Sequence, residues 1–250
     1  MIAVYDLVKT FGAFAAVDGV TLDVQPGEIH GFLGPNGAGK TTTMRMIAGL
    51  LKPTAGRIVV NHHDLATEPE AAKASLGFIP DRPFIYEKLT AGEFLRFHAG
   101  LFGLNEHGTA ERIAEMLELF ELARWQHELV ESFSHGMKQR LVMSAAFLHR
   151  PRAVVVDEPM VGLDPRGARL IKDVFRRMSA RGVAILMSTH TLEVAEEMCD
   201  RISIILRGRI IASGTVADLR RLAGSEDDEL TPVFLKLTGG SGLQEIDELL

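Results

Sequence analysis

One glycine-rich stretch constrains this chain more than any other. It reads Gly-Pro-Asn-Gly-Ala-Gly-Lys-Thr-Thr and fits G-x-x-x-x-G-K-[ST], the pattern of a loop whose backbone N–H groups surround phosphates. Glycines allow the required backbone conformations, which a Cβ would obstruct. We expect Lys40 to reach the β- and γ-phosphates and act in catalysis, and Thr41 to bind Mg²⁺. The residues expected to hold the phosphates are Gly34, Pro35, Asn36, Gly37, Ala38, Gly39, Lys40, Thr41 and Thr42.

The flanks of this loop support the same interpretation. Glu28–Leu33 has the composition of a short buried strand, and Met44, Ile47 and Leu51 recur afterwards at helical spacing. A strand, a glycine-rich loop and a helix, in this order, are the context that a phosphate-binding loop requires. The alternative is a glycine-rich turn that binds no ligand.

The composition is that of an ordinary globular protein. The chain has 250 residues, of which 46% are hydrophobic and 24% charged, so we expect one α/β domain with a subdomain. Its formal net charge of −6 argues against nucleic-acid binding, which usually needs a basic face. No apolar run approaches the roughly 18–20 residues that cross a bilayer, so we expect a cytoplasmic protein. A single cysteine, Cys199, agrees with a reducing compartment.

A second motif ends another buried strand. Ala153–Val156 is apolar and leads into Asp157 and Glu158, as expected for the second half of an ATPase with a phosphate-binding loop. In open α/β sheets ligands bind at the carboxyl ends of the strands. We therefore expect Asp157 to hold Mg²⁺ and Glu158 to orient and deprotonate the attacking water. The alternative is that both acids only cap the strand.

Two more strands are expected to end near the same edge. Leu76–Asp81 places Asp81 at a strand tip, and Val183–Met187 runs into Ser188-Thr189-His190. His190 would donate a hydrogen bond to the γ-phosphate, although a lone histidine can also be purely structural. The hairpin pattern of Ile202–Leu206 and Arg209–Ala212 follows.

The N-terminal region predicts a half-exposed sheet. Residues 2–8 and 20–24 alternate apolar and polar side chains, and residues 9–12 are expected to connect these two strands. A further strand is expected over Arg57–Val60. Phe11, in the connection, is suited to stacking on an adenine ring, because aromatic side chains stack well on nucleobases. Its alternative role is simple hydrophobic filling.

From Glu93 to about Arg150 the pattern becomes helical, as expected for an inserted helical segment. One set of apolar residues shares a helix face and is predicted to be core: Ile113, Met116, Leu117 and Phe120. A second set is predicted to be mostly core, with an exposed docking surface as the alternative: Phe94, Leu95, Phe97, Leu101 and Phe102.

The segment Phe133–Arg140, Phe-Ser-His-Gly-Met-Lys-Gln-Arg, is more specific than these patterns. It resembles the signature motif of ATP-binding-cassette (ABC) ATPases. Val161–Asp164 resembles the D-loop of that family, and Ser188–His190 resembles its switch-histidine loop. The resemblance covers about residues 2–220. It implies a P-loop NTPase fold of the α/β class, with a mixed sheet flanked by helices, an antiparallel β subdomain and a helical subdomain inserted at about 85–151. Residues 221–250 would form a C-terminal extension.

The resemblance also implies a dimer in which two chains, identical or related, sandwich two ATP molecules with Mg²⁺. Ser134, His135 and Gly136 of one chain would contact the γ-phosphate held by the other chain, and Asp164 would couple the two sites. Phe11 corresponds to the adenine-stacking aromatic residue, and Val17 to the residue beside it.

The chain departs from the family pattern in two features, one at Asp81 and one in the signature segment. Asp81 stands where the family usually has Gln; it could still bind Mg²⁺ or water, but its charge could also repel a triphosphate. In the signature, His135 replaces the first glycine of the usual pair and Met137 replaces a glutamine. The first departure is expected to bear on the rate of turnover or its coupling, and the second on the affinity of the sandwich.

Within the family, the amino-acid sequences of the signature segment and of Val233–Leu237 are most similar to those of stand-alone ATPase subunits. Such subunits energise a separate transmembrane permease, which is often an exporter. Such a subunit lies on the cytoplasmic face of the cell membrane. The alternatives are a soluble ABC ATPase that acts on DNA or ribosomes, and a weakly hydrolysing regulatory subunit.

Overall fold

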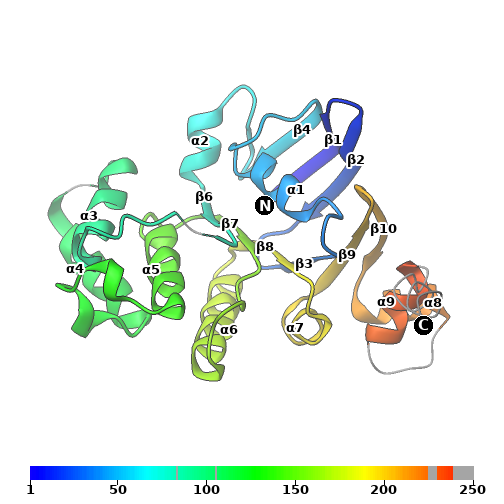
Figure 1. The fold of residues 1–250 in the computed structure, drawn as a ribbon. Helices are drawn as coiled ribbons and strands as arrows, with labels where there is room; N and C mark the ends of the chain where they lie inside the picture. The colour runs from blue at the N-terminus through cyan, green and yellow to red at the C-terminus, as the bar shows by residue number, and fades with distance from the viewer. Residues whose placement is uncertain (83, 105, 225–229, 239–250) are drawn as a thin grey trace.

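The computed structural model of the chain describes residues 1–82, 84–104, 106–224 and 230–238. The strands form two sheets (Figure 1). The first sheet consists of β1 (Ile2–Phe11), β2 (Phe14–Val24), β4 (Ala55–Val60) and β5 (His63–Asp64). These strands pair in the order β2-β1-β4-β5, and every pair is antiparallel. The expected antiparallel β subdomain is confirmed.

The connection between the first two strands was predicted wrongly. Residues 9–11 belong to β1, because Lys9, Thr10 and Phe11 pair with β2 residues up to Phe11 opposite Phe14. The turn is only Gly12-Ala13, and Gly12 has the positive φ of 59° that a turn this tight needs.

The second sheet forms the centre of the molecule. Its strands are β3 (Ile29–Leu33), β6 (Leu76–Ile79), β7 (Ala153–Asp157), β8 (Ala184–Thr189), β9 (Arg201–Leu206) and β10 (Arg209–Gly214). They lie in the order β10-β9-β3-β8-β7-β6; the β9–β10 pair is antiparallel and the other pairs are parallel. The expected mixed sheet is confirmed.

Nine helices are described, with two 3₁₀ turns between the fourth and fifth. Their bounds are α1 Lys40–Ile47, α2 Pro69–Ala74, α3 Ala91–Leu101, α4 Glu106–Leu119, η1 Ala123–Trp125, η2 Val130–Ser132, α5 His135–Phe147, α6 Pro165–Ala180, α7 Leu192–Met198, α8 Val216–Ala223 and α9 Leu230–Thr238. The helix after the phosphate-binding loop is shorter than the apolar spacing predicted. It ends at Ile47, and Gly49, with φ of 67°, turns the chain before Leu51.

The two sheets share a hydrophobic core with α1. Met44, Met46 and Ile47 of that helix are completely buried together with residues of β1 and Phe32 of β3. A second core joins the central sheet to α3–α6 and includes the predicted helix face, in which Ile113, Met116, Leu117 and Phe120 are at most 5% exposed. The antiparallel sheet and the helical segment therefore pack against different parts of the central sheet (Figure 1).

The second apolar set divides between core and surface. Phe94 and Leu95 are buried, whereas Phe97, Leu101 and Phe102 are 42%, 66% and 37% exposed. The prediction of a core position is confirmed for Phe94 and Leu95, while Phe97, Leu101 and Phe102 are too exposed to be core residues.

The C-terminal helices form a small core of their own against β9 and α7. Helix α8 lies across residue 220, the expected end of the ATPase domain, and α9 packs against α8. The acidic run Glu226–Glu229 lies outside the described residues. In the part of the chain that the structure describes, no helix combines the length and apolar character needed to span a bilayer.

Candidate nucleotide-binding site

The phosphate-binding loop connects β3 to α1, the strand–loop–helix order that the sequence predicts. Gly37 and Gly39 have φ of 78° and 110°, in the region that favours glycine. At two positions the loop also lies close to other backbone. A Cβ on Gly34 would lie 2.4 Å from the Ile205 carbonyl oxygen, and one on Gly39 would lie 2.6 Å from that of Ala16. Glycine is therefore required here by packing as well as by conformation.

Lys40, the first residue of α1, lies under the loop. It is 7% exposed, and its Nζ donates to the carbonyl oxygens of Gly34 at 2.5 Å and Pro35 at 3.1 Å. Burial lowers the pKa of this amine, while the charges of Glu158 and Asp157 act to raise it. The ammonium group therefore lies between the loop backbone and the carboxylates at the end of β7.

Hydrogen bonds link the start of α1 to the ends of β7 and β8. The Thr41 hydroxyl donates to Oδ2 of Asp157 at 2.7 Å, and the Ser188 hydroxyl donates to Oδ1 of the same carboxylate. The Glu158 backbone N–H donates to the Ser188 oxygen at 3.1 Å. Asp157 is only 2% exposed, and both of its oxygens accept hydrogen bonds. This network holds Asp157 beside the hydroxyl that is expected to share a cation with it.

Glu158 has an unusual backbone and a defined partner. Its φ of 51° is uncommon for a residue with a side chain, and such strain is typical of functional sites. One carboxylate oxygen, Oε1, lies 2.9 Å from Nδ1 of His190, and the two side chains are 14% and 55% exposed. The carboxylate is thus held at the mouth of the site, next to a ring that solvent can reach.

A cavity of about 370 Å³ opens above these groups. It brings together Phe11, Asp81, Asp157 and Glu158 with the loop. Its full lining is Phe11, Phe14, Ala16, Pro35, Asn36, Gly37, Gly39, Lys40, Thr41, Thr42, Asp81, Asp157 and Glu158.

Apart from the signature and D-loop residues described below, four predicted contact residues do not line this cavity: Val17, Gly34, Ala38 and His190. Gly34 and Ala38 belong to the loop but are buried, Val17 is completely buried in the core, and His190 contacts Glu158 at the mouth of the site. Phe14, which the sequence analysis missed, does line it and is 65% exposed. Phenylalanines on both sides of the Gly12 turn were the sequence signal for this pair of exposed rings.

The residues present fit Mg²⁺. Thr41, Asp81 and Asp157 offer oxygen atoms, which this cation prefers. Among the described residues no three His, Cys, Asp or Glu side chains are grouped to hold a metal by themselves. This agrees with a site at which phosphates complete the coordination, because Mg²⁺ is usually bound by one or two carboxylates and substrate phosphates.

The signature and D-loop residues form a separate group that does not line this cavity. The Ser134 oxygen caps α5 by accepting from the Met137 N–H at 3.3 Å, and Ser134 and His135 are exposed. The His135 ring packs against Gly162, where a Cβ would lie 2.3 Å from Cδ2 of that ring. Asp164 caps α6 through a 2.8 Å bond from the Gly167 N–H.

Comparison with known proteins gives a consistent result. The family model described as "ABC transporter" matches residues 17–161. The linearmycin resistance ATP-binding protein LnrL of Bacillus subtilis is 37% identical over 92% of this chain and 75% of its own length. The probable multidrug ABC transporter ATP-binding protein YbhF of Escherichia coli is 40% identical over 93% of this chain but only 40% of its own length. A solved ATP-binding subunit of an ABC transporter superposes with a TM-score of 0.90, at 37% identity, over 95% of this chain and 99% of that one. With the phosphate-binding loop, Asp157 and Glu158 assembled around one cavity and these relatives covering almost all of the chain, the protein belongs to the ABC transporter family as a nucleotide-binding ATPase cassette.

Proposed function

We propose that this chain hydrolyses ATP with Mg²⁺ and thereby drives a separate transmembrane permease, and that two cassettes close around two ATP molecules in each cycle. The observation that carries the proposal is the convergence of Lys40, Thr41, Asp157, Glu158 and His190 at the ends of β3, β7 and β8. These residue types, in this arrangement, match the known parts of phosphoryl-transfer sites.

Each polar side chain in the site has a distinct task. Lys40 binds the β- and γ-phosphates, and Thr41 and Asp157 hold the cation, which when bound neutralises charge that develops on the phosphates. Glu158 orients the attacking water and accepts its proton. His190, at 2.9 Å from the Glu158 carboxylate, positions that carboxylate and donates to the γ-phosphate. Asp81 lines the open side of the cavity, where it binds water.

The separation of the signature from the nucleotide cavity supports the dimer. The start of α5 is exposed and offers backbone N–H groups and the positive end of its helix dipole, which together suit an anion. Since Ser134 and Gly136 do not line the cavity of their own chain, the phosphate they contact belongs to a second chain. Asp164, beside them at the start of α6, is then in position to couple the two sites.

An exposed aromatic surface supports docking of the permease. Phe84 and Tyr86 follow Asp81 in the chain and are 83% and 46% exposed; Phe97 of α3 completes the group. The three rings make edge contacts, with centroids 5.4 and 5.3 Å apart. Exposed apolar groups of this kind mark interaction sites. Phe84 is only three positions after Asp81, which lines the nucleotide cavity, so docking at this group would act close to that cavity.

The direction proposed is export, with the chain on the cytoplasmic face of the membrane. Relatives are named for linearmycin resistance and for multidrug transport, and removal of a toxic compound from the cell is a direct route to resistance.

Co-purification tests this function. The tagged Glu158→Gln chain, purified from detergent-solubilised membranes with ATP present, is expected to carry a polytopic membrane protein in fixed ratio, identified by mass spectrometry. The purified wild-type chain is expected to hydrolyse ATP only when Mg²⁺ is present. Recovery with ribosomes or DNA, or an absence of turnover, contradicts the proposal.

A further inference from the structure

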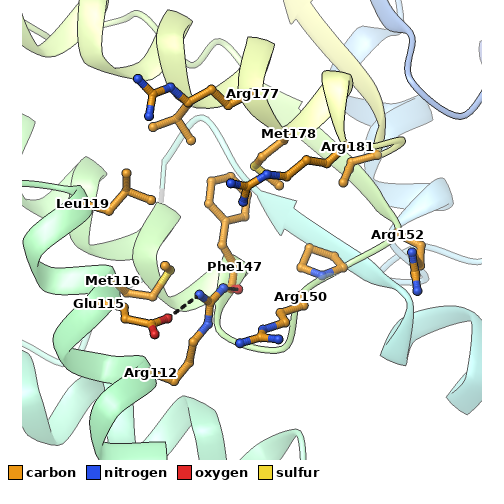
Figure 2. A pocket seen from close by; sticks show the side chains of 13 residues that line it. Arg112, Glu115, Met116, Leu119, Phe147, Arg150, Arg152, Arg177, Met178 and Arg181 are labelled. Atoms are coloured by element: carbon orange, nitrogen blue, oxygen red, sulfur yellow. Dashed lines mark hydrogen bonds and ion pairs between the residues drawn. The ribbon is translucent and has the colours of Figure 1, made fainter.

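A larger cavity, of about 570 Å³, lies apart from the nucleotide site and is seen from close by in Figure 2. It opens between α4 and the end of α5 on one side and α6 on the other. Arg152 and Val183, which line it, immediately precede β7 and β8, so the cavity lies at the amino ends of these strands, whereas the nucleotide site lies at their carboxyl ends. Its volume is in the range typical of small-molecule sites.

The floor of this cavity is apolar. Figure 2 shows the Phe147 ring near its centre, with Met116 and Leu119 on one side and Met178 on the other. The apolar lining side chains are Met116, Leu119, Phe147, Val174, Met178 and Val183. Such a surface suits an apolar ring or chain.

Arginines surround this floor. Arg112 has partners, because it pairs with Glu115 at 3.0 Å and donates to the Phe147 carbonyl oxygen at 2.9 Å. Four other lining arginines are exposed and, among the residues that the structure describes, have no carboxylate within ion-pair distance: Arg150, Arg152, Arg177 and Arg181. Figure 2 shows the guanidinium group of Arg181 extending toward the Phe147 ring and that of Arg150 extending toward the side chain of Arg112.

This grouping is unusual for the chain as a whole. The protein has 33 acidic and 27 basic residues, yet the cavity has five arginines and one glutamate. Arg177 and Arg181 also lie at the end of α6, where a cation stabilises the helix dipole. That role does not extend to Arg150 and Arg152, which come from the segment between α5 and β7.

Arg150 also adopts a strained conformation. Its φ is 53°, in the left-handed region where glycine or asparagine costs less free energy. The chain therefore keeps an arginine at a position where the backbone favours smaller residues, and its side chain lines the cavity.

We propose that this cavity binds a small organic anion that carries two or more negative charges on an apolar ring or chain. Guanidinium groups recognise phosphate and carboxylate through paired hydrogen bonds, and here they surround an apolar floor rather than a polar one. The ligand contacts α4 of the helical segment and α6 of the central core at once. The site is separate from the nucleotide cavity, since the two share no lining residue.

Calorimetric titration of the full chain with 1-naphthyl phosphate tests the proposal. We expect one site per chain, and at least tenfold weaker binding of either inorganic phosphate or 1-naphthol alone. Arg150→Asn and Arg181→Gln should each raise the Kd about tenfold, because a hydrogen bond to a charged group contributes about that factor. Arg150→Asn is compatible with the left-handed backbone, so its fold should be retained. Arg169→Gln removes a charge from an exposed position of α6 outside the cavity and should leave the Kd unchanged.

Several results would overturn this assignment. If Lys40→Ala abolished binding while the two cavity variants kept it, the probe would be in the nucleotide site. If all variants bound alike, or the wild type gave no heat, the cavity would not be an anion site. Binding of phosphatidylglycerol vesicles that depends on Arg150 and Arg181, without binding of 1-naphthyl phosphate, would assign the arginines to a membrane surface instead.

Discussion

Two helix starts in this molecule are suited to phosphate, and they differ in what surrounds them. Helix α1 follows Gly39, which has a left-handed conformation and no side-chain cap, so the backbone N–H groups of the loop remain available to an anion. Helix α5 follows Ser134, whose hydroxyl oxygen already accepts from its own helix. Lys40 and the acids of β7 surround the first start, whereas the second is exposed.

The difference indicates a division of labour. The start of α1 lies within hydrogen-bonding distance of a carboxylate network that can hold a cation and accept a proton. The start of α5 carries His135 and Lys138, the latter paired with Glu87, and can add binding to a phosphate but no base. Variants at the nucleotide site around α1 should therefore affect ATP hydrolysis, whereas variants at the start of α5 should affect assembly of the dimer.

The largest effect is expected from Glu158→Gln. Removal of a general base typically costs 10²–10⁴-fold in rate, so kcat for ATP hydrolysis should fall by about that factor. The ATP dissociation constant, measured with a fluorescent analogue, should change little because the amide keeps the shape of the side chain. Turnover within about threefold of the wild type would show that another group is the base.

Ser134→Ala should weaken the ATP-dependent assembly of the dimer. In the Glu158→Gln background, ATP-dependent dimerisation measured by analytical ultracentrifugation should weaken about tenfold, the effect of losing one hydrogen bond to a charged phosphate. Loss of the cap should also lower the free energy of unfolding by about 0.5–2 kcal/mol.

Two further variants separate these effects. Thr90→Ala removes the cap of α3 and should lower stability without affecting dimerisation. Ser134→Asp keeps a good capping residue but repels phosphate, so it should dimerise poorly at normal stability. Normal dimerisation of Ser134→Asp would remove α5 from the interface.

Asp81→Gln should raise turnover. A carboxylate near the phosphates opposes their charge by about 1 kcal/mol at high dielectric, so kcat/KM should increase about fivefold. Asp81→Asn serves as the matched control, because it removes the charge without restoring the length of glutamine. A fall in kcat/KM for both variants would mean that the Asp81 carboxylate binds the cation.

The smallest expected effect is a loss of stability at low pH, which should be greater in the helical segment than in the central sheet. Burial lowers the pKa of His98 in α3 and of His149 after α5; the bond from His149 to the Leu76 carbonyl oxygen partly opposes this shift. Each ring is therefore neutral in the folded state at a pH where the unfolded chain binds a proton. Their contribution to stability is present above the unfolded value of about 6.5 and is lost as the pH falls below it.

Hydrogen exchange followed by mass spectrometry at pH 7.5 and 5.5 measures this difference. Peptides from α3 and from the end of α5 should lose protection at the lower pH before peptides from β7 and β8 do. His149→Gln can still donate to the Leu76 carbonyl oxygen and should reduce the loss around α5. Equal loss of protection across both regions would contradict the assignment.

Much of the fold could be predicted because its signals are local. The loop pattern, the apolar run before Asp157 and Glu158, and the helical spacing around Met116 each depend on residues close in the sequence. Predictions from the sequence were weaker where contacts between distant residues determine the structure. The alternation of residues 2–8 gave no sign that β1 continues to Phe11, since that extension depends on pairing with β2. The arginines of the second cavity are spread from Arg112 to Arg181 and form no motif.

The sequence by itself determined which chemical groups this protein has: a glycine loop with the phosphate-binding pattern, two acids at a strand end and a signature segment. Only the tertiary structure decided how they meet. Thr41 and Asp157 are 116 positions apart, and they bond because β8 lies between β3 and β7 and contributes Ser188 to the same carboxylate. Strand order in a parallel sheet is set by how the crossover segments pack on its faces, and no local residue pattern encodes that packing.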